Sequence, residues 1–201
     1  MPIESNIEAD HLLLHFTPNQ WAGDGGLPLI TRGEGCWVYD ADSKRYFDGL
    51  SSLFCSQLGH SVRPSIVQAV IDQLERLPYW TNWTSLHPSA AALATRLGQL
   101  APPGLDRVFF VNSGSEANES AIKLARQYHA ARGEPVRYKT ISRRLAYHGT
   151  TLGALSLTGI PALRSMFEPL MAGARHVSNR TDITAHRGRR RASSSRRCSP
   201  S

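Results

Sequence analysis

The chain has 201 residues, of which 41% are hydrophobic, so it is long enough to bury the core of one ordinary domain. Its formal net charge of +7 is concentrated at one end, because residues 180–201 contain seven Arg against one Asp and the preceding residues are close to neutral. No stretch is long and apolar enough to cross a bilayer, and residues 1–10 lack a basic region followed by an apolar core, so we expect a cytoplasmic protein without a membrane partner.

The predicted elements alternate between helix and strand after an N-terminal arm that extends to about residue 28. Apolar residues recur at helical spacing between Val62 and Leu74, and a second helix is predicted to begin at Pro88. In chain order, we predict a β-hairpin region over 29–49, helices over 63–77 and 88–101, a strand over 107–112, a helix over 115–132, a strand over 139–142 and helices over 150–157 and 161–172. This order is typical of an α/β sheet with parallel strands.

The most informative local feature is an apolar run, Val108–Val111, that enters a predicted helix through Ser113, Gly114 and Ser115. The first turn of a helix leaves about four backbone N–H groups without partners and carries roughly half a positive charge, so it binds phosphate readily. Glycine lets the backbone approach closely, and the hydroxyls can cap the helix or donate to phosphate oxygens. The alternative interpretation is an ordinary capping box from Ser113 to Glu116 that opens a structural helix.

A second run, Ala146–Thr151, follows about thirty residues later. Together with Asn112–Glu119, it resembles the large domain of the class III aminotransferases, which are pyridoxal phosphate (PLP) enzymes of fold type I. Upstream stretches have counterparts in the same order in that family: Thr31–Asp40, Tyr46–Ser51, Leu58–His60 and Leu77–Trp80. The pattern is most similar to the ω-amino acid:pyruvate, or β-alanine:pyruvate, branch, and the resemblance covers roughly residues 10 to 179.

The resemblance implies an incomplete α/β PLP-transferase fold of type I, made of the N-terminal arm and hairpin plus the first part of the large-domain sheet. Residues 1–60 would form an N-terminal segment that is part of the small domain in the family, and residues 61–179 would form an incomplete PLP-binding large domain. The implied reaction transfers an amino group from an ω-amino acid or amine to pyruvate or a similar keto acid, and the complete relative would be a homodimer. An aminomutase or a decarboxylase of the same fold is the alternative.

The resemblance also assigns cofactor contacts to this sequence. Ser113, Gly114 and Ser115 would hold the cofactor phosphate. Tyr147 would stack its ring on the pyridine of PLP, and His148 would lie beside the cofactor. The alternative interpretations are a half-buried turn aromatic for Tyr147 and a satisfied hydrogen-bonding group for His148.

The resemblance assigns a substrate pocket to Phe16, Leu53 and Phe54. Phe54 falls where the ω-amino acid branch usually carries a Trp that walls the pocket, so the wall stays aromatic here but loses an indole N–H. This change would alter substrate preference more than cofactor binding. The alternative for Phe16 is an apolar residue in a loosely packed N-terminal segment.

Transamination also needs a lysine that forms a Schiff base with the cofactor, and a carboxylate that pairs with the pyridine nitrogen. The three lysines are Lys44 in a hairpin turn, Lys123 inside a helix and Lys139 at the start of a strand, and none lies in a loop rich in small residues. In the family, both catalytic groups come from sequence beyond residue 201. We therefore expect no catalytic residue here and a truncated chain that is inactive alone. The alternative function is a non-catalytic remnant that at most binds PLP or phosphate.

Residues 180–201 are rich in Arg and Ser and cannot build a core, so we expect a disordered tail. The abrupt change after residue 179 suggests a shifted reading frame, and a genuine shortened protein with a basic tail is the alternative. The tail could attract nucleic acid phosphates, but it contains no aromatic residue that could stack a base, so a nucleic acid partner is not favoured. The Cys and His residues show no metal-ligand spacing, and we expect no metal.

Overall fold

The structure is a computed structural model that describes residues 12–17 and 27–179. The chain divides into two compact units, Met1–Pro88 and Ser89–Ser201. The boundary expected at residue 60 stays a prediction, and the expected disordered or frame-shifted tail lies outside the described residues. Within the described part of the chain, no helix is long and apolar enough to cross a membrane.

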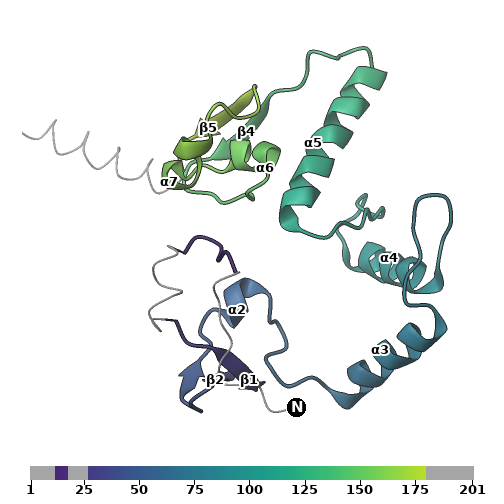
Figure 1. The fold of residues 1–201 in the computed structure, drawn as a ribbon. Coiled ribbons are helices and arrows are strands. Elements are labelled where there is room, and N and C mark those ends of the chain that lie inside the picture. Colours follow the sequence, from purple (N-terminus) through teal and green to yellow (C-terminus); the bar gives the residue numbers. More distant parts are fainter. Residues whose placement is uncertain (1–11, 18–26, 180–201) are drawn as a thin grey trace, which may run out of the picture. The chain divides into compact units, whose positions relative to one another are not determined.

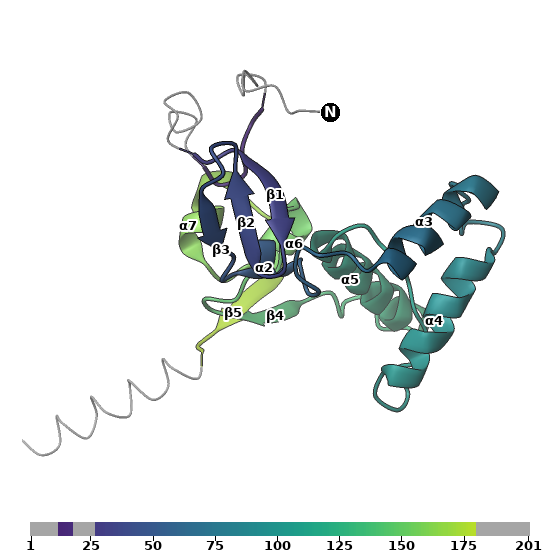
Figure 2. The same cartoon turned by 90° about the horizontal axis from the view of Figure 1, so that it is seen from below.

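The first unit contains a three-stranded antiparallel sheet where the hairpin region was predicted. Its strands are β1 (Ile30–Glu34), β2 (Trp37–Asp40) and β3 (Arg45–Phe47), in the order β1-β2-β3 (Figure 2). The carboxylate of Asp40 closes the turn before β3, because it accepts hydrogen bonds from the backbone of Lys44 (2.9 Å) and the hydroxyl of Tyr46 (2.8 Å). The hairpin prediction is therefore confirmed, with a third strand added.

A short left-handed turn, α2 (Ser51–Phe54), follows the sheet and was not predicted. All four residues have positive φ angles, between 48° and 68°. An L-residue in this conformation costs about 1–2 kcal/mol, and none of the four is glycine. The turn is followed by α3 (Pro64–Arg76), which matches the helix predicted over 63–77 and begins with proline at its first position, where no N–H is needed.

The second unit combines helices with two parallel strands (Figure 1). Its elements are α4 (Pro88–Leu100), α5 (Gly114–Ala131), β4 (Thr140–Arg143), α6 (Leu152–Leu157), α7 (Pro161–Arg164), the 3-10 turn η1 (Ser165–Phe167) and β5 (Ala174–Val177). Strands β4 and β5 pair in parallel, with Thr140 opposite Ala174. The buried apolar residues of this unit are Ile122 on α5 and Ala154, Leu155 and Leu157 on α6. The core therefore lies where α6 contacts α5 and the sheet.

Two predicted elements are wrong in this unit. Residues 107–112 do not form a strand, since no described segment pairs with them and Phe109 is 78% exposed. Strand propensity depends on a partner that covers the strand, and the apolar run lacks one here. The helix predicted over 161–172 ends with η1 at Phe167, because the residue before Pro169 is forced into an extended conformation (Glu168, φ −69°, ψ 143°). The remaining helices and β4 are confirmed to within two residues, and β5 was not predicted.

Candidate cofactor-binding site

The helix α5 begins at a capped N-terminus in the second unit. Ser113 is the N-cap, and its Oγ accepts a hydrogen bond from the backbone N–H of Glu116 at 3.2 Å. The Glu116 carboxylate in turn accepts from the backbone N–H of Asn112 at 2.8 Å. The capping interpretation is thus present in the structure. Among the residues that the structure describes, the backbone N–H groups of Gly114 and Ser115 have no hydrogen-bond acceptor, so they remain free for an anion.

The turn over residues 148–151 lies directly against this helix start. The backbone N–H of Thr150 donates to Ser115 Oγ at 3.1 Å, and Asn118 Nδ2 donates to the carbonyl of His148 at 2.7 Å. Gly149 has a φ of +123°, and a Cβ at this position would overlap Ser115 Oγ. Only glycine fits both requirements. The two motifs singled out in the sequence therefore meet, with the second packed on the first turn of α5.

Two further side chains hold the turn in place. The Thr158 hydroxyl is fully buried, accepts from the backbone N–H of His148 and donates to the carbonyl of Gly149, each at 3.0 Å. The carboxylate of Glu119 accepts from the Thr151 hydroxyl at 2.7 Å. Sequence reasoning did not assign a role to Asn118, Glu119 or Thr158. The available signal was that Asn118 and Glu119 follow Ser115 by three and four residues, which places all three on one helix face.

The remaining predicted site residues occupy defined positions. Tyr147 directly precedes the turn and its side chain is 55% exposed, while His148 is half-buried with both backbone polar groups bonded. Leu53 and Phe54 lie on the left-handed turn of the first unit, and each is 70% exposed. Phe16 also belongs to the first unit and has a positive φ of 55°. The structure therefore brings together the predicted phosphate and ring contacts of the second unit. The predicted pocket residues belong to the first unit.

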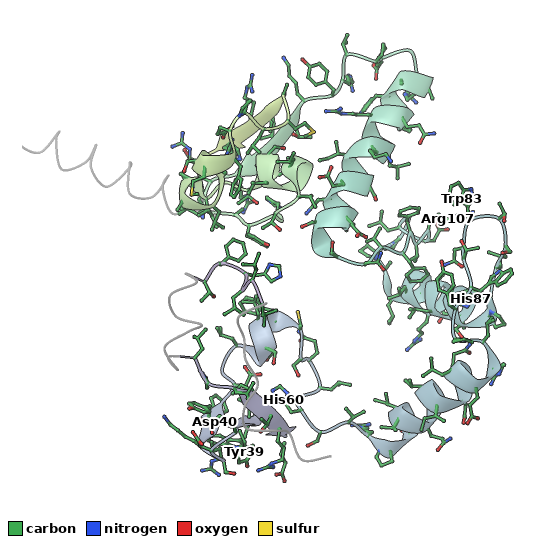
Figure 3. All side chains as sticks on the ribbon, in the orientation of Figure 1. Tyr39, Asp40, His60, Trp83, His87 and Arg107 are labelled. Atoms are coloured by element: carbon green, nitrogen blue, oxygen red, sulfur yellow. The ribbon has the colours of Figure 1, made fainter. Side chains whose placement is uncertain are left out.

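One carboxylate, Asp48, holds that left-handed turn and was not predicted to do so. Asp48 accepts from the backbone N–H of Ser52 at 2.8 Å and lies 2.8 Å from Nε2 of His60. His60 lies beside the sheet of the first unit (Figure 3), where its backbone N–H donates to the carbonyl of Gly35 at 2.8 Å. The Ser52 backbone hydrogen bond, and after it the His60 contact, hold the pKa of Asp48 below its ordinary value.

Comparison with known proteins decides the family. The family model described as aminotransferase class-III matches residues 22–199. The chain belongs to the class III aminotransferases. The match runs past residue 179, where the sequence analysis placed the end of the resemblance, into the part of the chain that the structure does not describe. The predicted family and fold class are therefore confirmed. Class III aminotransferases are PLP-dependent enzymes.

Individual members of the family show the extent of the likeness. The chain is 42% identical to a probable aminotransferase of Mycobacterium tuberculosis, over 87% of the chain and 37% of that protein. It is similar to the solved structure of an (S)-enantioselective omega-transaminase from Thermomicrobium roseum, with a TM-score of 0.80 and 40% identity, over 85% of the chain and 38% of that structure. The omega transaminase of Pseudomonas jessenii in complex with PMP has a TM-score of 0.79 and 34% identity, over 84% and 38%. The chain thus spans well under half the length of these class III aminotransferases.

The N-terminus of α5 suits the phosphate group of this family's cofactor. Two N–H groups that have no acceptor in the described part of the chain, at Gly114 and Ser115, lie at the positive end of an 18-residue helix. The Ser113 and Ser115 oxygens accept from backbone N–H groups, and this leaves each hydroxyl proton free to be donated. The oxygens of a phosphate group accept hydrogen bonds from N–H and O–H donors of this kind. The donor set therefore fits the cofactor.

Proposed function

We propose that this chain forms the phosphate- and ring-binding part of an aminotransferase that moves an amino group from an ω-amino acid or amine to pyruvate or a similar keto acid. The observation that carries the proposal is the contact between the start of α5 and the turn over 148–151, at Ser115 and Thr150. A homodimeric protein is part of the proposal through the family resemblance, and a cytoplasmic location stays a prediction from the sequence.

The contacts at the start of α5 support the phosphate-binding roles, and the family resemblance supplies the role of Tyr147. The N–H groups of Gly114 and Ser115 and the hydroxyls of Ser113 and Ser115 would bind the phosphate, because they are donors at the helix N-terminus. Tyr147 precedes the turn that is packed on this helix start, and by the family resemblance its ring would cover one face of the pyridine. PLP bound there would supply an electron-accepting ring and a carrier for the amino group.

Binding without catalysis is a second candidate function, and the positions of the lysines favour it. Lys44 lies in the turn between β2 and β3, Lys123 lies within α5 and Lys139 precedes β4. None of these three lies in the phosphate-binding turn. In this candidate, the chain alone binds and orients the cofactor, and the residues that carry out the chemistry come from outside it.

Phosphate-dependent binding is the first test of the proposal. Isothermal titration compares pyridoxamine 5'-phosphate with pyridoxamine, neither of which has an aldehyde that could react with a surface lysine. We expect the phosphorylated compound to bind at least about tenfold more tightly, as for a gain of charge-assisted hydrogen bonds. Ser115→Ala should remove much of this difference, whereas Ser165→Ala, on the exposed η1 turn of the same unit, should not. Equal affinity for the two compounds would contradict the proposal.

A chemical test separates the two candidate functions. The chain is incubated with PLP, reduced with borohydride and digested, and mass spectrometry measures the pyridoxyl group on each lysine. We expect only partial labelling spread over Lys44, Lys123 and Lys139. Complete labelling of one of them would identify a lysine that forms a specific Schiff base with the cofactor and would contradict binding without catalysis.

A further inference from the structure

The carboxylate of Glu119 connects two helices of the second unit at the candidate phosphate site. Its Oε1 atom accepts hydrogen bonds from the Thr151 hydroxyl at 2.7 Å, from the Gly153 N–H at 2.9 Å and from the Ala154 N–H at 3.2 Å. The last two donors lie in the first turn of α6, where backbone N–H groups have no acceptor within the helix itself. Thr151, the N-cap of α6, makes no side-chain capping bond of its own. Glu119 therefore caps α6 from α5.

The backbone of α6 lies close to this carboxylate. A Cβ on Gly153 would overlap the Glu119 carboxylate, so the backbone of α6 approaches as closely as glycine permits. At the other end of the turn, a Cβ on Gly149 would overlap Ser115 Oγ and lie 2.9 Å from the Cβ of Ala154. The segment from Gly149 to Ala154 is therefore fixed on α5 at two points, Ser115 and Glu119.

We propose that Glu119 is a positioning residue for the phosphate site. By fixing Thr151, Gly153 and Ala154, it keeps the Thr150 N–H on Ser115 Oγ. The Thr150 bond occupies a lone pair of Ser115 Oγ and turns the hydroxyl proton away from Thr150, so Ser115 is prepared to donate to a phosphate oxygen. This inference rests on the proposed function, since it assumes that the start of α5 holds the cofactor phosphate.

The negative charge of Glu119 and its positioning role have opposite effects on phosphate affinity. Glu119 is an anion one helical turn from the proposed phosphate position, so by Coulomb's law its removal alone would strengthen phosphate binding. A positioning role predicts the opposite. Charge-assisted hydrogen bonds are roughly twice as strong as neutral ones, so Glu119→Gln, which keeps an acceptor oxygen, should retain part of the function that Glu119→Ala loses.

The experiment titrates inorganic phosphate and pyridoxamine 5'-phosphate into the wild type and matched variants. We expect affinity to fall in the order wild type, Glu119→Gln, Glu119→Ala, with about a tenfold loss in the last. Glu134→Gln is the control, because it removes the same charge in the same unit beyond the C-terminal end of α5 and should leave affinity unchanged. Tighter or unchanged binding in both Glu119 variants would overturn the proposal.

Two additional measurements distinguish a loss of positioning from a loss of folding and from a failure of the proposed function. Thr151→Val removes one of the three donors to Glu119 and keeps the two backbone donors of α6. We expect it to reduce phosphate affinity less than Glu119→Ala does. The Thr150 amide resonance, observed by ¹⁵N NMR without ligand, should move in Glu119→Gln and not in Glu134→Gln. If the wild type binds no phosphate, the proposed function fails, and the Thr150 resonance still decides whether Glu119 positions the turn. An unmoved resonance would overturn that role.

Discussion

Nε2 of His60 lies 2.8 Å from a carboxylate oxygen of Asp48, which also accepts the backbone N–H of Ser52. This contact ties the left-handed turn to the chain segment that follows it. Four consecutive residues with positive φ would be unfavourable in an isolated peptide. The carboxylate offsets part of that cost by accepting the backbone N–H of Ser52 in the turn.

The stability of the first unit should therefore depend on pH through Asp48. Its pKa is lowered in the folded chain, first by the Ser52 N–H and then by His60, so the carboxylate stabilises the fold above its ordinary pKa of 3.8. That contribution is lost as the pH falls below 3.8 and through the folded-state pKa. Thermal unfolding between pH 2 and pH 7 should show a shallower acid decline in Asp48→Asn than in the wild type. Asp72→Asn, on the exposed surface of α3, is the control and should keep the wild-type decline.

The left-handed turn should become more stable when one of its residues is replaced by glycine. Leu53 has φ 59° and ψ 48°, and its exposed side chain buries little surface. Leu53→Gly relieves about 1–2 kcal/mol of backbone strain and loses about 0.4–1 kcal/mol through the more flexible unfolded chain, so we expect a net gain of about 0.5–1 kcal/mol in urea unfolding. Leu58→Gly, at an exposed position without a positive φ, should reduce stability. A loss in both variants would show that Leu53 is not strained.

Two threonines of the second unit should respond in opposite ways to the same substitution. The Thr158 hydroxyl is fully buried and makes two hydrogen bonds, so Thr158→Val should cost about 1–3 kcal/mol by leaving the His148 N–H and the Gly149 carbonyl unsatisfied. The Thr140 hydroxyl is buried without a partner among the described residues, so Thr140→Val should be neutral or stabilising by up to about 1 kcal/mol. Denaturant unfolding of the two variants measures the difference. Equal losses would contradict the hydrogen-bond assignment.

Two glycines of the site should differ in their tolerance of alanine. Gly149→Ala places a Cβ against Ser115 Oγ at a φ of +123°. We expect the free energy of unfolding to fall by about 1–3 kcal/mol and the binding of pyridoxamine 5'-phosphate to weaken. Gly114 has open space around it, so Gly114→Ala should not reduce stability. Unfolding curves and titration of both variants provide the comparison. A stable Gly149→Ala variant would mean that the turn does not lie as close to α5 as the structure shows.

Several helices of both units could be predicted because their signals are local. The apolar spacing of α3 and α4, and the cap at Ser113, act within a few residues of the chain, and the helix bounds agree to within one or two residues. The phosphate-binding interpretation of Ser113–Ser115 also came from local chemistry. It remains a proposal, and the contact between Ser115 and Thr150 supports it.

The sequence by itself indicated the family through several motifs in order along the chain. It also predicted α3, α4, α5 and α6 and the two motifs of the candidate site, because these depend on residue types at short spacing. Only the tertiary structure decided which segments pair and which side chains fix them. The apolar run at 107–112 has strand propensity but pairs with no strand among residues 12–17 and 27–179, whereas Ala174–Val177 pairs with β4. Likewise, Glu119 and Asp48 are ordinary surface carboxylates in the sequence. Glu119 gains its role because folding brings it the Thr151 hydroxyl and the Gly153 N–H from more than thirty residues away, and Asp48 gains His60 from twelve residues away. Local patterns do not encode these contacts.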